Sequence, residues 1–384
     1  MNYLDAFQKE LSLKLQGRDV FLYWKGRVGL YAILKAMGVG EGDEVILPAF
    51  TCVVVPNAII YLGAKPVYVD IKSSTFNMDV NLVESKINER TKAIICQNTF
   101  GLSCDIDQII YIAKKNELYT IEDCTHGFGG TYEDKLNGTS CDAAFFSTQW
   151  NKPFSTGIGG FSILNNTALL PSLSKTNEAL ETPSWTRNLS LKVQLFLRDT
   201  ILTDKNYWSL LRLYRFLSAK NMITGSSSKE EIENITMPKD YLMGMGTVQA
   251  KKGLKTLNSI DDSIELRKRN AKSYTNFLIA EKKNHVTECL FKNHSFLKYP
   301  LLVKDRKLFF ELAEKTKIRL GDWFLSPIHP IQSNYHQWSF DMDNFPTANK
   351  IAKNIINLPT DLDENKTKEV ILFLEMHQNL IEDL

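Results

Sequence analysis

Short apolar runs alternate with stretches of helical periodicity through the first 164 residues. Near-continuous apolar runs, typical of strands buried on both faces, occupy residues 44–50, 65–71, 92–97, 118–123 and 142–147. Apolar residues at helical spacing lie between them, at 54–63, 79–87 and 105–116, and Asp79 and Asp105 are suitable N-caps for the last two. This order predicts βαβ units and a largely parallel sheet, whose ligands bind beyond the carboxyl ends of the strands.

The pattern changes after the fifth of these runs. Residues 161–166 predict an antiparallel strand, and residues 165–235 predict a helical insertion with amphipathic helices at 189–202 and 207–217. Residues 185–220 contain seven Lys or Arg and two Asp, a local net charge of +5. We expect these helices to pack on the sheet or on another subunit, with binding to a membrane surface or an acidic partner as the alternative.

The C-terminal part has a different pattern of apolar and polar residues. Residues 225–231 predict a flexible polar connector, and from about residue 247 the spacing predicts one long helix. That helix leads into a smaller α+β unit. We therefore expect a large domain over 1–245, which includes the insertion, and a small domain over 246–384.

The composition excludes several classes of protein. The 384 residues exceed the usual size of one core, and 43% apolar with 23% charged residues describes a globular chain. A net charge of +2 gives no field that favours nucleic acid. No apolar run approaches the ~18 residues of a membrane span. The start is polar and helix-like, and the six cysteines never form C-x-x-C. We expect a cytoplasmic enzyme or binding protein with reduced thiols and no metal site.

Two positions carry the candidate chemistry. Asp123 ends a predicted strand, and Lys152 follows the next one and precedes the glycine-rich run STGIGG. A lysine near a carboxylate in a cleft can form a Schiff base, and the aspartate can keep a pyridine nitrogen protonated. Ser147 and Ser155 flank the lysine and could donate hydroxyls to a phosphate. The plainer interpretation makes Asp123 a helix cap and Lys152 a solvated charge.

Several blocks of the chain match a known family. They include GVGEGDEVILPAFTC, IEDCTHGFGGTYEDK, FFSTQWNKPFSTGIGGF and FPTANKIAKNIINLPT, in this order along the chain. The chain resembles the DegT/DnrJ-type sugar aminotransferases, which use pyridoxal 5′-phosphate and have the aspartate-aminotransferase fold of type I. The resemblance implies an α/β architecture with a mainly parallel seven-stranded sheet, helices on both faces and a smaller α+β C-terminal domain. It also implies a homodimer.

The resemblance assigns roles to individual residues near the lysine. It makes Lys152 the Schiff-base lysine and Asp123 the partner of the pyridine nitrogen. Ser147 takes the position of a phosphate-binding hydroxyl, and His126 that of a residue beside the ring substituents. Thr125 takes the position of a small residue against the ring face.

Other assignments depart from the family pattern. Residues 26–29 (GRVG) precede a predicted helix, LYAILKAMG, so Arg27 and Val28 are candidates for the phosphate seat, although many relatives have Thr or Ser at the position of Arg27. Cys52 stands where the family often places an aromatic residue on the ring. Gly244 stands near the position from which the partner subunit often supplies a polar side chain.

The substrate is expected to meet an aromatic, polar loop at residues 321–338. Trp323 and His329 are its candidate contacts, and Phe154 is a third candidate. The alternative for this loop is a packing role, with prolines that stiffen it.

The resemblance implies transfer of an amino group, from L-glutamate, to a keto group of a nucleotide-linked sugar, for aminosugar and surface polysaccharide synthesis. One alternative acceptor is a cyclitol or a non-sugar ketone. A pyridoxamine-dependent sugar dehydratase is another alternative, although Lys152 argues against it because such relatives carry histidine there. The last alternative is a scaffold without turnover on the same fold.

Overall fold

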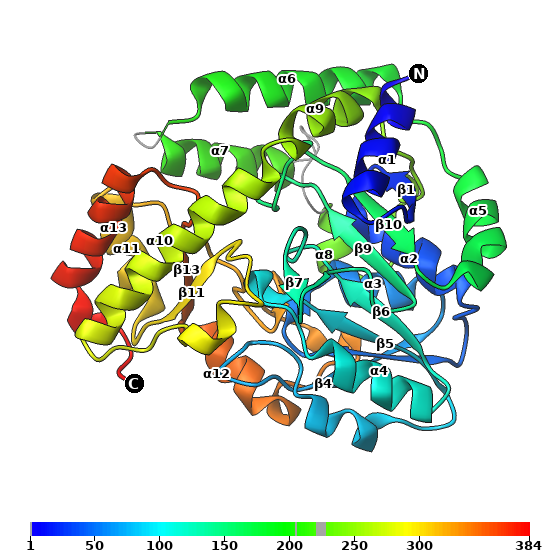
Figure 1. Cartoon of the computed structure of the whole chain (residues 1–384), viewed down its shortest axis with the longest axis horizontal. Helices are drawn as coiled ribbons and strands as arrows, with labels where there is room; N and C mark the ends of the chain where they lie inside the picture. The colour runs from blue at the N-terminus through cyan, green and yellow to red at the C-terminus, as the bar shows by residue number, and fades with distance from the viewer. Residues whose placement is uncertain (1, 204–205, 220–227) are drawn as a thin grey trace.

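The computed structural model describes residues 2–203, 206–219 and 228–384, and its centre is a seven-stranded sheet (Figure 1). The strand order is β1-β10-β9-β6-β5-β2-β4. Five parallel strands correspond to the five apolar runs: β2 (Glu44–Pro48), β4 (Lys65–Val69), β5 (Thr91–Gln97), β6 (Tyr119–Asp123) and β9 (Ala143–Ser147). The expected antiparallel strand is β10 (Gly160–Leu164), and β1 (Asp19–Tyr23) pairs antiparallel with it at the edge. The predicted fold class is confirmed.

Helices cover both faces of this sheet. The described helices before the insertion are α1 (Tyr3–Lys14), α2 (Gly26–Ala36), α3 (Val54–Ile60), α4 (Ile106–Lys115) and α5 (Leu170–Glu178). Successive residues of β5 point to opposite sides, as the pleat requires. Ile95 packs in the apolar cluster that contains residues of α2 and α3, whereas Ile94 and Cys96 pack in the cluster that contains residues of α4. The carboxyl ends of the strands remain the place for a site.

Two helix predictions are corrected by the structure. Residues 79–87 form two short 3₁₀ turns, η1 (Val80–Leu82) and η2 (Glu84–Lys86), because a segment this short with β-branched residues holds a helix poorly. Asp79 does cap the first turn, accepting a hydrogen bond from Asn81 N. Asp105 precedes α4, but its carboxylate accepts a hydrogen bond from Tyr132 Oη (3.1 Å) instead of capping the helix.

The predicted long helix is two helices, α9 (Thr247–Leu257) and α10 (Ile260–Ala280). The break falls at Asn258 and Ser259, residue types whose side chains compete for backbone hydrogen bonds. Ser259 Oγ donates to Thr256 O (3.2 Å), which is such a local bond.

The insertion contains the two predicted helices, α6 (Trp185–Ile201) and α7 (Tyr207–Ala219). Part of the expected connector, residues 225–227, lies outside the described residues. The rest of it is not an open linker, because Ser228 caps a short helix, α8 (Lys229–Glu233), through a capping box with Glu231.

The C-terminal part packs around a small two-stranded sheet of β11 (Tyr299–Leu302) and β13 (Ile355–Leu358). The helices α11 (Arg306–Lys315), α12 (Pro346–Asn354) and α13 (Glu364–Met376) also belong to this part. Tyr274 of α10, Tyr299, Phe309 and Phe373 belong to an apolar cluster of this part. The domain division at 245/246 stays a prediction.

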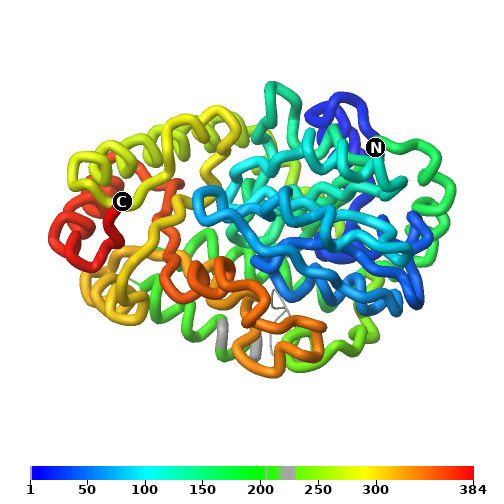
Figure 2. The backbone as a smooth tube through the Cα atoms, turned by 90° about the horizontal axis from the view of Figure 1, so that it is seen from below, coloured from blue at the N-terminus to red at the C-terminus, as the bar shows by residue number. Residues whose placement is uncertain are grey.

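The C-terminal part also returns to the large sheet. Figure 2 shows its orange segment running along the N-terminal half. There β12 (Ile328–His329) pairs in parallel with β3 (Thr51–Cys52), and Tyr68 Oη donates to Trp338 O (2.9 Å). The loop 321–338 is therefore attached beside the strand ends where a site is expected.

The remaining described elements are short. They are the hairpin of β7 (Thr131–Tyr132) and β8 (Lys135–Leu136) and the 3₁₀ turns η3 (Thr99–Gly101), η4 (Thr167–Leu169), η5 (Glu288–Leu290), η6 (Tyr335–Trp338), η7 (Met342–Asn344) and η8 (Gln378–Leu380). Within the described ranges, no helix is long and apolar enough to cross a membrane.

Candidate active site

The N-terminus of α2 lies directly against the ends of two strands. A Cβ atom on Gly26 would come within 2.6 Å of Phe146 O, and one on Gly160 would come within 2.2 Å of the Gly26 Cα. Only glycine fits such approaches of backbone to backbone. The first turn of α2 therefore lies beside Ser147, the last residue of β9, and its N-terminal dipole favours an anion there.

Asp123 and Ser147 end neighbouring strands, so both side chains reach the same edge of the sheet. The Asp123 carboxylate is 3% exposed and accepts a hydrogen bond from the backbone N–H of Thr125 (2.9 Å). Burial raises the pKa of Asp123, while the bond from Thr125 and the charge of Lys152 act in the opposite direction. A buried carboxylate of this kind favours a cationic group beside it.

Lys152 lies on the loop after β9, five residues beyond Ser147. Its Nζ is 4.4 Å from the centroid of the Trp323 ring. Burial lowers the pKa of Lys152 from 10.5 to about 8, against the opposing effect of Asp123. A substantial fraction of this amine is neutral near physiological pH, as a nucleophilic or proton-transferring lysine requires.

His126 and Trp323 form a stacked pair beside the lysine. Their rings are parallel within 1° with centroids 4.6 Å apart. Burial first, and then the charge of Lys152, lower the pKa of His126 well below its usual value, so the imidazole is neutral. Its Nδ1 accepts a hydrogen bond from Phe100 N (3.1 Å), which puts the ring proton on Nε2.

The loop 321–338 brings His329 to Cys52. The two residues are partners in the pairing of β12 with β3, and His329 O accepts a hydrogen bond from Val53 N (2.8 Å). His329 Nδ1 accepts from Leu325 N (3.0 Å). Burial raises the pKa of Cys52, and the nearby charges of Arg27 and Lys152 lower it, which places this thiol among the candidate residues.

The structure gives Arg27 a protein partner that sequence reasoning missed. Its guanidinium forms a buried ion pair with Glu231 of α8, and Lys25 Nζ is 3.9 Å from Glu231 Oε2. Burial alone would raise the pKa of Glu231, but Arg27 and Lys25 outweigh it and lower the pKa to about 2. The capping box Ser228–Glu231 is the sequence signal that could have indicated an ordered helix here.

Val28, Thr125 and Phe154 differ in where the structure places them. The Val28 side chain is buried in the core and its N–H donates to Lys25 O (3.1 Å), so neither is directed at the phosphate seat. Thr125 lies between Asp123 and His126, as expected. The expectation that Phe154 contacts substrate is corrected, because its ring packs in an apolar cluster 5.0 Å from the ring of Phe128.

Two arginines hold the lysine loop from outside. Arg198 of α6 donates to Trp150 O (2.9 Å), with its guanidinium 4.9 Å from the Trp150 ring centroid. Arg267 of α10 donates to Pro153 O (2.8 Å). The two accepting residues lie on either side of Lys152 in the sequence, so α6 and α10, which are remote in sequence, hold the loop in place. Gly244 bonds through its N–H to Glu181 O (2.9 Å) and has no side chain to offer a partner subunit.

Comparison with known proteins identifies the family. The model of the DegT/DnrJ/EryC1/StrS aminotransferase family matches residues 2–183 and 201–374. The chain belongs to this family. Among curated relatives, the GDP-perosamine synthase of Escherichia coli O157:H7 is 39% identical over 168 residues, which cover 44% of this chain and 46% of that protein. The spore coat polysaccharide biosynthesis protein SpsC of Bacillus subtilis is 27% identical over 365 residues, 93% of this chain and 84% of that protein.

Solved structures of the family share the fold. The chain is similar to a DegT DnrJ EryC1 StrS aminotransferase from Brucella abortus, with a TM-score of 0.76 and 21% identity over 98% of this chain and 90% of that one. It is equally similar to the PMP-form of Spr1654 from Streptococcus pneumoniae, described as a putative sugar aminotransferase, with a TM-score of 0.76 and 23% identity over 99% of this chain and 92% of that one. The chain spans about half the length, or less, of the first curated relatives it matches.

The residues present fit pyridoxal phosphate, the cofactor of this aminotransferase family. The N-terminus of α2 and Ser147 could bind the phosphate group. Asp123 could bind the pyridine nitrogen, and the amine of Lys152 could react with the aldehyde. The carboxylate of Glu231 pairs with the side chains of Arg27 and Lys25 at this end of α2. Bound there, the cofactor supplies an electron-withdrawing ring.

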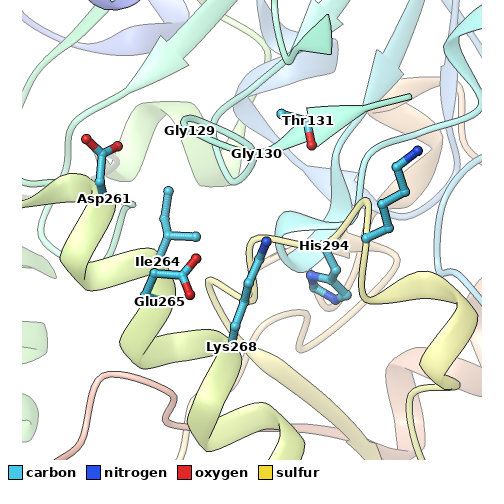
Figure 3. A pocket seen from close by; sticks show the side chains of 9 residues that line it. Gly129, Gly130, Thr131, Asp261, Ile264, Glu265, Lys268 and His294 are labelled. Carbon is cyan, nitrogen blue, oxygen red and sulfur yellow. The ribbon is translucent and has the colours of Figure 1, made fainter. Parts of the chain in front are cut away.

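A separate cavity of about 180 Å³ lies between α10 and the segment before β7 (Figure 3). Glu265 and Lys268 of α10 face into it, with Gly130 and the buried His294 opposite. None of the predicted site residues lines this cavity, and its carboxylates and amines balance one another.

Replacing Glu231 with glutamine should destabilise the fold by about 3 kcal/mol at pH 7, because it leaves Arg27 buried without its partner charge. The pKa of Glu231 lies below its unfolded value of 4.5, so the stabilisation is complete above pH 4.5 and is lost as the pH falls towards 2. Urea unfolding measures the change, with the exposed Glu230→Gln on the same helix as control. Equal stability of the two variants would show that this ion pair does not stabilise the fold.

Proposed function

We propose that this chain transfers an amino group from L-glutamate to a keto group of a nucleotide-activated sugar, in aminosugar synthesis for a surface polysaccharide. The observation that carries the proposal is the Lys152 amine, whose pKa burial lowers to about 8 and which acts electrostatically on the buried Asp123 at the sheet edge. Relatives support the substrate class. They include GDP-perosamine synthases and a UDP-2-acetamido-2-deoxy-3-oxo-D-glucuronate aminotransferase of Pseudomonas aeruginosa, 40% identical over 149 residues.

Each of four side chains has its own role in amino transfer. With the cofactor bound, Lys152 Nζ would be the base that takes and returns the proton of the substrate's amino carbon. Asp123 would hold the pyridine nitrogen in its protonated form through its negative charge. The neutral His126 presents its Nε2 proton as a donor, and the stacked Trp323 shields the amine from water.

A second candidate acceptor is a cyclitol ketone. A relative from Streptoalloteichus tenebrarius, 35% identical over 158 residues, is described as a putative L-glutamine:3-amino-2,3-dideoxy-scyllo-inosose aminotransferase. Lys152 argues against the dehydratase alternative, and the electrostatic coupling of Lys152 to the buried Asp123 argues against a scaffold without turnover. The proposal retains the homodimer and the cytoplasmic location expected from the sequence.

The donor half of the reaction is visible in an absorption spectrum. We expect the protein with pyridoxal phosphate to show a visible band that depends on Lys152, and L-glutamate to bleach it. L-glutamine added separately is the test of the cyclitol-type alternative. A band that neither amino acid changes would contradict the proposed donor.

The rate of cofactor capture should depend on the neutral form of Lys152. We expect it to rise about tenfold per pH unit below pH 8 and to level off above it, because the pKa of this amine is about 8. Asp123 raises that pKa, so Asp123→Asn should move the midpoint to lower pH. Stopped-flow absorbance of the cofactor-free protein with pyridoxal phosphate gives the profile. A midpoint near 10.5, the ordinary lysine value, would contradict burial of the amine.

A further inference from the structure

A buried arginine of α10 has unused hydrogen-bond donors beside the lysine loop. Arg267 is 7% exposed, and its Nη2 donates to the carbonyl oxygen of Pro153 (2.8 Å), the residue after Lys152. Its Nε and Nη1 have no hydrogen-bond acceptor among the described residues. A buried charged donor without an acceptor is costly to a fold, and a bound anion is a partner that would offset the cost.

Lys298 is a second cation next to the candidate site. Its backbone N–H donates to Phe100 O (3.2 Å), and the N–H of Phe100 donates to His126 Nδ1 (3.1 Å). The Lys298 side chain is half-buried. After burial, its charge is among the causes that lower the pKa of Lys152 and the pKa of His126. Because such effects weaken with distance, the ammonium lies near both side chains.

Hydrogen bonds from α10 fix one carboxylate near Arg267. Asn270, three residues further along this helix, donates through Nδ2 to Thr360 O (2.9 Å) and to Leu362 O (2.7 Å). These two carbonyls belong to the residues on either side of Asp361. Burial lowers the pKa of Arg267, and the charge of Asp361 acts in the opposite direction. Asp361 is therefore close enough to neutralise part of the charge of this cluster.

The cluster has more positive than negative charge. Thr360 Oγ1 donates to Phe296 O (2.7 Å), two residues before Lys298, so the same segment brings Asp361 near this lysine. Burial lowers the pKa of Lys298, Asp361 opposes this effect, and the charge of Arg267 adds to it. Two cations thus share one carboxylate, and a net positive charge remains beside the site.

We propose that Lys298, supported by the charge of Arg267, binds a carboxylate of the amino donor and selects a dicarboxylate over its monoamide. Ammonium and guanidinium groups bind carboxylates through charge-assisted hydrogen bonds. L-glutamate and L-glutamine differ only in that one has a second carboxylate where the other has an amide. A neutral amide would leave the surplus cation without a counter-charge, which disfavours the amide. The inference rests on the proposed function and deepens it by naming the residues that choose the donor.

Stopped-flow absorbance of the protein with bound pyridoxal phosphate measures the donor preference. The readout is the second-order rate constant for L-glutamate divided by that for L-glutamine, a ratio that cancels any effect on Lys152 common to both donors. We expect Lys298→Met and Arg267→Gln each to lower this ratio by at least about tenfold. The exposed Lys304→Met and Arg269→Gln are the matched controls and should keep the natural ratio. An unchanged ratio in Lys298→Met would overturn the proposal.

Calorimetric titration with compounds that carry no amine tests the subsite without turnover. We expect glutarate to bind the natural protein with pyridoxal phosphate at least about tenfold more tightly than its monoamide, and Lys298→Met to lose this difference. Equal binding of the two compounds by the natural protein would overturn the proposal, even if the variant does not fold. UDP is the third probe: weaker binding of UDP but not of glutarate by Lys298→Met would assign the cations to phosphate and overturn the donor subsite. These titrations do not involve amino transfer, so the subsite and the proposed function can fail independently.

Discussion

Replacing Lys152 with alanine is expected to lower amino transfer by at least about 1,000-fold, because the variant lacks the amine that moves the proton at the substrate carbon. The variant should also lose the visible cofactor band, since the amine that captures the aldehyde is absent. The fold should survive, because Lys152 is a loop residue whose backbone N–H bond to Gln149 O does not depend on its side chain.

Steady-state turnover and a thermal melt of the same preparation measure both parts of this prediction. Lys350→Ala removes an exposed lysine of α12 and should leave turnover unchanged. Turnover of Lys152→Ala within tenfold of the natural protein would refute the central assignment. A lower melting temperature with normal turnover would make the lysine structural.

Replacing Asp123 with asparagine should lower turnover by about 100-fold or more while the cofactor still binds. The amide has nearly the shape of the carboxylate and no charge, so it cannot keep the pyridine nitrogen protonated. Loss of a single charge in a buried site has large effects because the surroundings screen it weakly. The Thr125 N–H, which donates to Asp123 Oδ1 at 2.9 Å, can still donate to the amide oxygen, and this favours a folded variant.

Turnover numbers at saturating substrate test this effect, together with the absorbance of the bound cofactor. The exposed Asp107→Asn in the first turn of α4 is the charge-matched control. A variant with normal turnover would show that Asp123 serves only to shape the loop. A variant that no longer binds the cofactor would move its role from the chemistry to binding.

The sheet was predictable because buried parallel strands leave continuous apolar runs in the sequence. β1 was missed, since DVFLY is an edge strand of only five residues, of which two are fully buried. The 3₁₀ turns at 79–87 show the opposite error: the apolar spacing was helical, but the segment was too short to sustain a helix.

The core of the candidate site was predictable for a topological reason. Asp123 and Ser147 end adjacent parallel strands, and Lys152 follows closely, so the fold brings them to one edge. Partners remote in sequence left no such signal. Glu231 is 204 positions from Arg27, and Arg267 is 114 positions from Pro153. Such pairs arise from packing, which no local pattern records.

Transfer of labelled nitrogen tests the central claim most directly. The purified protein with pyridoxal phosphate is incubated with ¹⁵N-labelled L-glutamate and, in separate reactions, with UDP-2-acetamido-2-deoxy-3-oxo-D-glucuronate and with the keto sugar that corresponds to GDP-perosamine. The account predicts a ¹⁵N-containing aminosugar nucleotide in at least one reaction, together with 2-oxoglutarate, and neither product with Lys152→Ala. Labelled aminosugar formed equally well by Lys152→Ala, or 2-oxoglutarate without any labelled sugar, would contradict it.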